Sequence, residues 1–158
     1  MASDSIEIAV KGGWKSSRFA IALLILTILH HAYGAAIYGT PWRLHVAFVA
    51  VPVAGAILIA SQSRGASWQR IAGILILIFP VLLIGLIEGG YNHLLKNIVY
   101  FTRGAAATRS LFPSSLYELP DNLLFEVTGV AQFFLAPFAA MEGVEMLRQT
   151  AFRGDSPK

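Results

Sequence analysis

Four long apolar stretches constrain the fold of this chain more than any other feature of its sequence. Each contains about 20 residues, and polar or basic residues separate each stretch from the next. A helix rises about 1.5 Å per residue, so about 20 apolar residues can cross roughly 30 Å of hydrocarbon. The sequence therefore predicts an all-α integral membrane protein, folded as an antiparallel bundle of four transmembrane helices.

Composition and the spacing of the apolar stretches define the expected organisation. Hydrophobic residues make up 56% of the 158 residues and charged residues only 13%, whereas about a quarter of a soluble domain is charged. The first stretch is long for the apolar region of a signal peptide, so we expect it to be retained as a helix. We expect one domain over residues 1–158, with transmembrane helices at about 19–38, 42–61, 71–100 and 122–147 and a long outer loop at about 103–121.

Local sequence signals indicate where the fourth helix begins and where the third can contact a neighbour closely. Asp121 or Asn122 can cap the fourth helix, because a short polar side chain accepts a hydrogen bond from the free amides of a first turn. Gly85 and Gly89 form a GxxxG step, which permits close contact between helices. The long loop contains the apolar residues Leu111, Phe112, Leu116 and Tyr117, and we expect it to fold over the outer mouth of the bundle.

The absence of cysteine and the placement of the basic residues exclude several classes of function. Without cysteine there is no disulfide, thiolate ligand, iron–sulfur cluster or covalently attached c-type haem. The net charge is +3, but lysine and arginine flank the apolar stretches, where they contact lipid headgroups. We therefore expect no nucleic-acid partner. The expected partners are membrane lipids and either further copies of this chain or other membrane subunits.

The distribution of lysine and arginine predicts the orientation in the membrane. The N-terminal segment, the segment 62–70 and the C-terminal tail together contain eight of these residues, against four in the turn near Arg43 and the region 96–121. Basic residues accumulate on the cytoplasmic side. The count therefore predicts that both termini are cytoplasmic, in a bacterial inner membrane or an equivalent membrane.

The ionisable residues inside the predicted helices gather mainly near the outer face. A charge within a membrane helix is costly, so such residues usually face the protein interior and often serve a function. Antiparallel threading brings all four histidines of the chain to this layer. The candidate metal ligands are His31, His45, Glu88, His93 and Glu126. The other candidate site residues are His30, Arg43, Tyr91, Asn92 and Asp121.

Imidazole and carboxylate without sulfur form a ligand set suited to a transition metal, here iron, copper or zinc. A pair of these histidines could alternatively bind one haem b. The spacing raises a difficulty, because Glu88 and His93 are five residues apart, or about 140° around an ideal α-helix. They can face one ion only if Gly89 and Gly90 distort the turn. His30 and His31 differ by about 100°, so we expect only one of them, His31, to face the site.

Three functions follow as hypotheses. The first is a redox or metal-dependent membrane protein with its site in the outer leaflet. The second is a non-catalytic accessory subunit of a larger membrane complex, in which the polar residues make subunit contacts. The third is a small enzyme or carrier for a lipid-like substrate, with Glu88 and a histidine as acid and base. Polar side chains that converge inward favour a site, whereas side chains that face outward favour a partner.

Overall fold

The protein is all-helical. The computed structural model describes residues 2–113 and 117–154, and describes side chains over 17–113 and 117–151. About 90% of the chain is helix, and the described residues contain no strand. The elements are α1 (Ala2–Tyr38), the 3₁₀ helix η1 (Pro41–Leu44), α2 (His45–Gln62), α3 (Ala66–Ile76), the π-helix η2 (Leu77–Leu95), α4 (Lys96–Leu111) and α5 (Leu123–Gly154).

Four helical segments are long and apolar enough to cross a membrane. They are Ser17–Tyr38, Pro41–Gln62, Ala66–Leu111 and Leu123–Ala151. The first two agree closely with the predicted helices. In the third, α3, η2 and the first part of α4 run together to a kink at Gly104, close to the predicted end near residue 100, and a further helical stretch then continues to Leu111. Residues 103–111 of the predicted loop are therefore helical, with a kink at Gly104, whose φ of +80° favours glycine.

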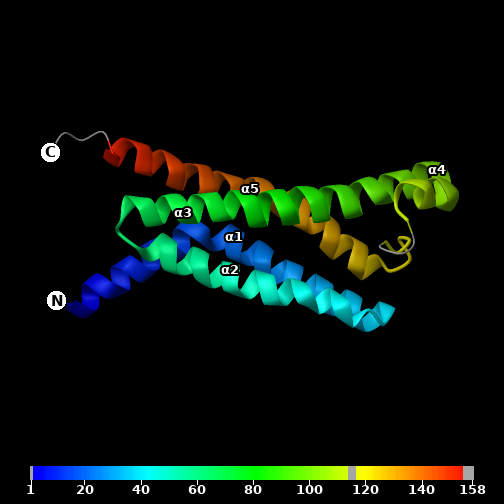
Figure 1. The fold of residues 1–158 in the computed structure, drawn as a ribbon, viewed down its shortest axis with the longest axis horizontal. Coiled ribbons are helices and arrows are strands. Elements are labelled where there is room, and N and C mark those ends of the chain that lie inside the picture. The colour runs from blue at the N-terminus through cyan, green and yellow to red at the C-terminus, as the bar shows by residue number, and fades with distance from the viewer. Residues whose placement is uncertain (1, 114–116, 155–158) are drawn as a thin grey trace.

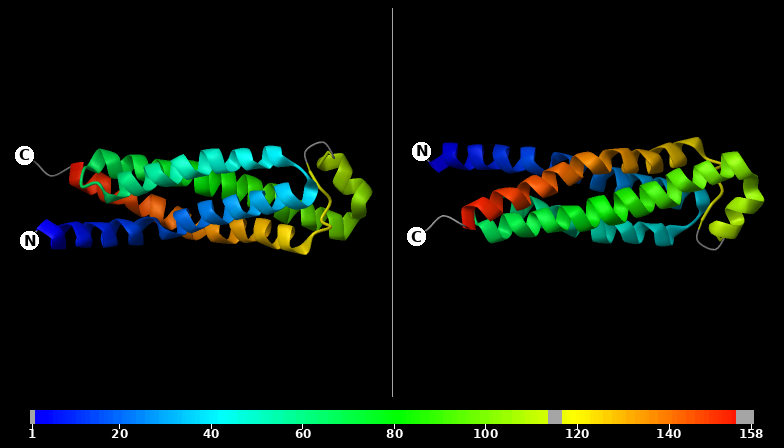
Figure 2. Two further views of the ribbon diagram at one scale, coloured as in Figure 1. Left: turned by 90° about the horizontal axis from the view of Figure 1, so that it is seen from below. Right: turned by 90° about the horizontal axis from the view of Figure 1, so that it is seen from above.

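The helices pack into an elongated bundle (Figures 1 and 2). The start of α1 and the end of α5 lie at one end of the molecule, and α4 lies at the other. Helix α5 packs against η2, α1 and α3, while α2 packs against α1 and α3. The buried core contains mainly small and branched apolar side chains, including Ala20, Leu23, Ile57, Ile76 and Ala139.

Glycines allow η2 and α5 to approach closely. A Cβ atom added at Gly85 would overlap the Cβ of Ala136, and one added at Gly89 would overlap the backbone nitrogen of Phe133. The predicted close contact at the GxxxG step is therefore confirmed. Small residues at such a step let two helix backbones meet without side chains between them.

Two polar side chains of the bundle satisfy free backbone groups. The Asn122 side chain accepts a hydrogen bond from the Phe125 amide at 3.0 Å, so Asn122, and not Asp121, caps α5. Near the other end, α1 is kinked at Ser17, which has φ −136° and ψ 15°. Glu142 of α5 accepts hydrogen bonds from the Phe19 and Ala20 amides that follow this kink. It thereby caps the apolar part of α1 from a neighbouring helix.

The segment after α4 covers part of the bundle as expected, although not with every predicted residue. Phe112 is buried and packs against the rings of Tyr91 and Tyr117. Arg109 donates a hydrogen bond to the Tyr117 carbonyl, which holds the segment against the end of α4. Leu111 is 55% exposed and does not contribute to this cover, and Leu116 lies outside the described residues.

Candidate metal site

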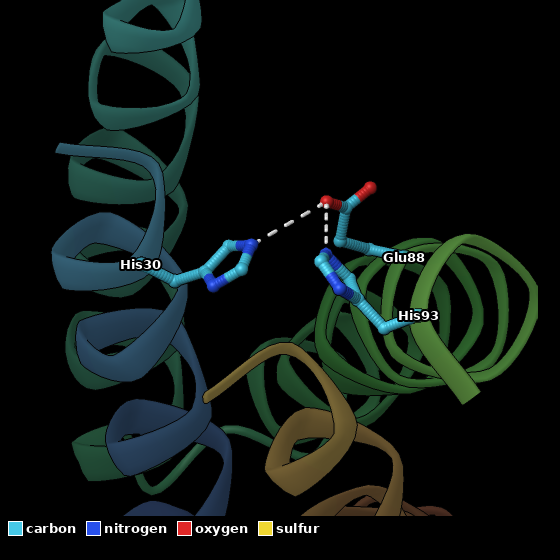
Figure 3. A group of neighbouring side chains, drawn as sticks. All are labelled: His30, Glu88 and His93. Carbon is cyan, nitrogen blue, oxygen red and sulfur yellow. Dashed lines mark ion pairs between the residues drawn. The ribbon is translucent and has the colours of Figure 1, made fainter. Parts of the chain in front are cut away.

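Three ligand-bearing side chains converge between α1 and η2. The ligand atoms of His30, Glu88 and His93 all lie within 4.8 Å of one another. Figure 3 shows His30 reaching across from α1 toward the two residues of η2, with one Glu88 oxygen facing both imidazoles. This oxygen, Oε1, lies 3.8 Å from His30 Nε2 and 3.5 Å from His93 Nε2. Two ligand atoms held about 2.1 Å from a tetrahedral ion lie about 3.4 Å apart, so the group could hold a metal ion.

The π-helix removes the spacing difficulty between Glu88 and His93. Both residues lie in η2, where the backbone hydrogen bonds join residues five apart and each turn is wider than in an α-helix. The angle around the helix axis between residues five apart is therefore smaller than the 140° of an α-helix, so both side chains can point to the same side. A π-helical stretch of 19 residues is unusually long, and such turns occur frequently at functional sites.

Outer hydrogen bonds fix which nitrogen of each histidine faces the site. Glu126 Oε2 lies 2.9 Å from His93 Nδ1, so His93 donates its Nδ1 proton there and turns Nε2 toward Glu88. His30 Nδ1 lies 2.9 Å from Thr128 Oγ1, which turns its Nε2 toward the site. The Thr128 hydroxyl also lies within hydrogen-bond distance of two backbone carbonyls of its own helix, and when it donates to one of them it accepts from His30 Nδ1. His30 Nε2 is buried without a hydrogen-bond partner.

With both imidazoles neutral and protonated at Nδ1, the group presents two nitrogen lone pairs and a carboxylate oxygen to one another. A cation between them would relieve their mutual repulsion. The second Glu88 oxygen accepts a 2.6 Å hydrogen bond from Asn92, which leaves Oε1 for the site. Acidic or histidine ligands held by an outer hydrogen-bond partner are typical of protein metal sites.

Glu126 lies behind His93 and belongs to a closed polar network. Besides His93, it accepts hydrogen bonds from Lys96 Nζ at 2.8 Å and from the Asn97 amide. Lys96 is 2% exposed and Glu126 is 5% exposed, so this ion pair is buried. Among the predicted ligands, Glu126 therefore positions His93 through its outer nitrogen and is not one of the three residues whose ligand atoms converge.

The remaining candidate residues surround the group at different distances. Both His30 and His31 face inward, so the expectation that only one does so is wrong: His31 Nε2 lies 3.5 Å from the same Glu88 oxygen. His31 is not one of the three mutually close residues. His45 is exposed, and its Nδ1 lies 2.6 Å from the Trp42 carbonyl oxygen. The structure therefore does not bring His45 into the group.

Arg43, Tyr91 and Asp121 serve contacts away from the three ligand atoms. Arg43 is buried beside aromatic rings, with its guanidinium 3.8 Å from Glu118. Tyr91 packs against Phe112 as described above, and Asp121 accepts a 2.7 Å hydrogen bond from the Tyr38 hydroxyl.

A cavity of about 420 Å³ adjoins the group. Glu88, His93 and His31 line it, as do Lys96 and Asn92, whereas His30 does not. The three-residue group thus adjoins the cavity through Glu88 and His93. Tyr117 also lines the cavity, and burial raises the pKa of its phenol above the ordinary value. Its hydroxyl therefore remains a hydrogen-bond donor at neutral pH.

Sequence reasoning missed Thr128, Lys96 and Phe125 at this site. Lys96 lies three residues after His93, a spacing that places both on one side of a helix, so its position was a usable signal. Phe125 stacks on the His30 ring with centroids 4.2 Å apart. Nothing in the sequence distinguishes Phe125 or Thr128 from the other residues of an apolar helix.

Comparison with known proteins identifies no relative. No protein-family model matches the chain, and neither a curated protein nor a solved structure matches it. The function therefore has to be inferred from the site itself.

Proposed function

We propose that this chain is an antiparallel four-helix membrane protein that binds one divalent transition-metal ion through His30, Glu88 and His93 and uses it for metal-dependent chemistry. The observation that carries this proposal is the convergence of three possible ligand atoms, of which the buried His30 Nε2 has no hydrogen-bond partner. Both imidazoles are preset by outer partners to present Nε2. The polar side chains converge inward, which favours a site over contacts with a partner subunit.

The ligand set favours zinc or iron. Two histidines and one carboxylate occur in zinc enzymes that keep an open position for water or substrate, and in non-haem iron(II) oxygenases. The cavity next to Glu88 and His93 offers space for such an open position. A haem between His30 and His93 is less compatible, because Glu88 Oε1 lies close to both nitrogens, where the flat porphyrin would have to pass.

The apolar character of the protein surface supports membrane insertion. Many large apolar side chains are exposed, among them Phe48 at 81%, Ile59 at 72%, Leu123 at 80% and Met141 at 69%. Exposed apolar residues in such number are typical of a surface in contact with lipid or with other membrane helices. We propose that the termini face the cytoplasm, so that the metal group lies toward the outer face.

Metal content tests the proposal. The full-length protein is purified in detergent, loaded with Zn²⁺ or Fe²⁺, passed through a desalting column and measured by elemental analysis and visible spectroscopy. We expect one metal per chain and no Soret band. His30→Ala, Glu88→Gln and His93→Ala should each lose most of the metal. His45→Ala is the matched control, since His45 is exposed and outside the group, and it should retain full metal.

Circular dichroism of each variant shows whether it has kept its helices. Full metal content in folded His30→Ala and His93→Ala would overturn the proposed ligand set. A Soret band in the wild-type protein would instead favour haem.

A further inference from the structure

We propose that the 420 Å³ cavity binds a single-chain amphipathic molecule whose head group supplies an oxygen ligand to the metal. This inference rests on the proposed metal site and names the class of molecule that the site accepts. The cavity is large enough for the head group and the first part of a chain, since pockets for small organic ligands begin at about 300 Å³.

The lining of the cavity contains polar and apolar side chains, here called its polar end and its apolar end. The polar end includes Glu88, His93 and His31. The apolar end comes mainly from α2 and η2, and in η2 Phe79 and Leu83 precede Glu88 by nine and five residues. The apolar residues of α2 are Val46, Val49 and Ala50. A wholly polar ligand would leave the apolar end unfilled, and a wholly apolar ligand would leave Glu88 and the histidines without a partner. A molecule with a polar head and an apolar chain satisfies both ends.

The charges at the polar end indicate which head group binds. Lys96 is paired with Glu126, and Arg43 lies beside Glu118. Glu88 is then the carboxylate left to neutralise a metal ion, since an imidazole binds a metal ion in its neutral form. A divalent ion held by one carboxylate retains a net positive charge. The site therefore favours an oxygen-bearing head group that is anionic or readily deprotonated, such as a carboxylate, an enolate or a hydroxamate.

The apolar end of the cavity reaches the surface of the bundle. Val49 is 49% exposed and Leu83 is 43% exposed, and both line the cavity. They belong to α2 and η2, whose main packing partners are other helices: α2 packs on α1 and α3, and η2 packs mainly on α5. An apolar chain can therefore leave the cavity sideways, between α2 and η2, into the region that lipid would occupy.

Alkyl hydroxamates test this inference. Full-length protein in lipid nanodiscs is loaded with Co²⁺, and its visible spectrum is titrated with acetohydroxamate and with octanohydroxamate. Val49→Trp narrows the apolar end. Val51→Trp is the matched control, since Val51 lies on the same helix, is 59% exposed and does not line the cavity.

We expect Val49→Trp to weaken the binding of octanohydroxamate by about tenfold or more, because the indole and the alkyl chain would compete for the same part of the cavity and overpacking is costly. It should change the affinity for acetohydroxamate by less than about twofold, and Val51→Trp should change neither affinity. An equal loss of affinity for both hydroxamates, or no loss for either, overturns the inference. If the protein has still bound cobalt in that case, the proposed metal site is retained. A chain that binds no cobalt overturns the proposed function and this inference with it.

Discussion

The substitution Glu126→Gln separates the proposed metal-binding role of the polar network from its structural role. Glu126 accepts hydrogen bonds from His93 Nδ1 and from Lys96, and both it and Lys96 are at least 95% buried. A glutamine has nearly the same shape but no charge. It leaves the Lys96 ammonium buried without its counter-charge, and it weakens the acceptor that holds the His93 ring.

Two different magnitudes follow from this one change. Removing one partner of a buried ion pair costs about 3–5 kcal/mol of folding free energy. Losing the outer partner of a metal-binding histidine lowers metal affinity by about 10–100-fold, equivalent to about 1.4–2.7 kcal/mol. The double variant Glu126→Gln/Lys96→Met removes the unpaired charge and should recover most of the lost stability, because a neutral pair has no buried charge to compensate. It should not recover metal affinity, because His93 still lacks its carboxylate.

The assay needs two readouts on the same preparations. Zinc affinity is measured by competition with a chromophoric chelator, and stability is measured by unfolding in mixed micelles of a mild detergent and dodecyl sulfate. Wild-type zinc affinity in folded Glu126→Gln would refute the role assigned to the His93–Glu126 hydrogen bond. Recovery of zinc affinity together with stability in the double variant would show that Glu126 acts only through folding.

Two further predictions concern the bundle and its orientation. Glu142→Ala should destabilise the protein by about 0.5–2 kcal/mol, because the Phe19 and Ala20 amides lose their cap, whereas Glu145→Ala, at an exposed position on the same helix, should be nearly neutral in the same unfolding assay. The chain has no cysteine, so single cysteines at Ser67 and Ala106, both exposed, can report topology. An impermeant maleimide added to intact cells should label the cysteine at 106 and not the one at 67, and the opposite pattern would place the termini outside.

Hydropathy predicts the four long helices because burial in lipid requires nearly every residue of a span to be apolar. It does not predict the end of the third span. Residues 101–111 include two arginines and three consecutive alanines, so they carry no apolar signal even though they are helical. The helix is interrupted at Gly104, and a second helical stretch follows it to Leu111, before Pro113. Gly104 kinks it, and the kinked end turns the segment that follows back over the bundle.

The candidate site was only partly predictable for a different reason. The depth of each polar residue follows from its position in a span, and depth placed His31, Glu88 and His93 in one layer. Whether side chains meet depends also on how each helix is rotated and wound. An α-helical spacing separates Glu88 from His93, and only the π-helical hydrogen bonding of η2 brings them together. The spacing of apolar residues does not indicate this change from α-helical to π-helical hydrogen bonding.

The sequence weakly indicates how α1 is rotated about its own axis. Ala20, Leu23, Leu24 and Thr27 are buried and recur at the spacing of one helix face. His30 follows Thr27 by three residues and His31 follows it by four, so the same face includes both histidines. His30 then points to Glu88 and His93, while His31 lines the cavity. The 100° between neighbouring residues is smaller than the width of a buried face, and for this reason one helix can present both.

The contact between η2 and α5 links the stability of the bundle to the chemistry of the site. Gly85 and Gly89 let the two backbones meet. The close approach brings one turn of α5 behind both histidines, where Glu126 and Thr128 hydrogen-bond the two Nδ1 atoms. Gly129 follows directly, and any Cβ there would overlap the His93 ring. The residues that hold the bundle together thus also decide which nitrogens face Glu88, so a side chain added at this contact should disturb metal binding before it unfolds the protein.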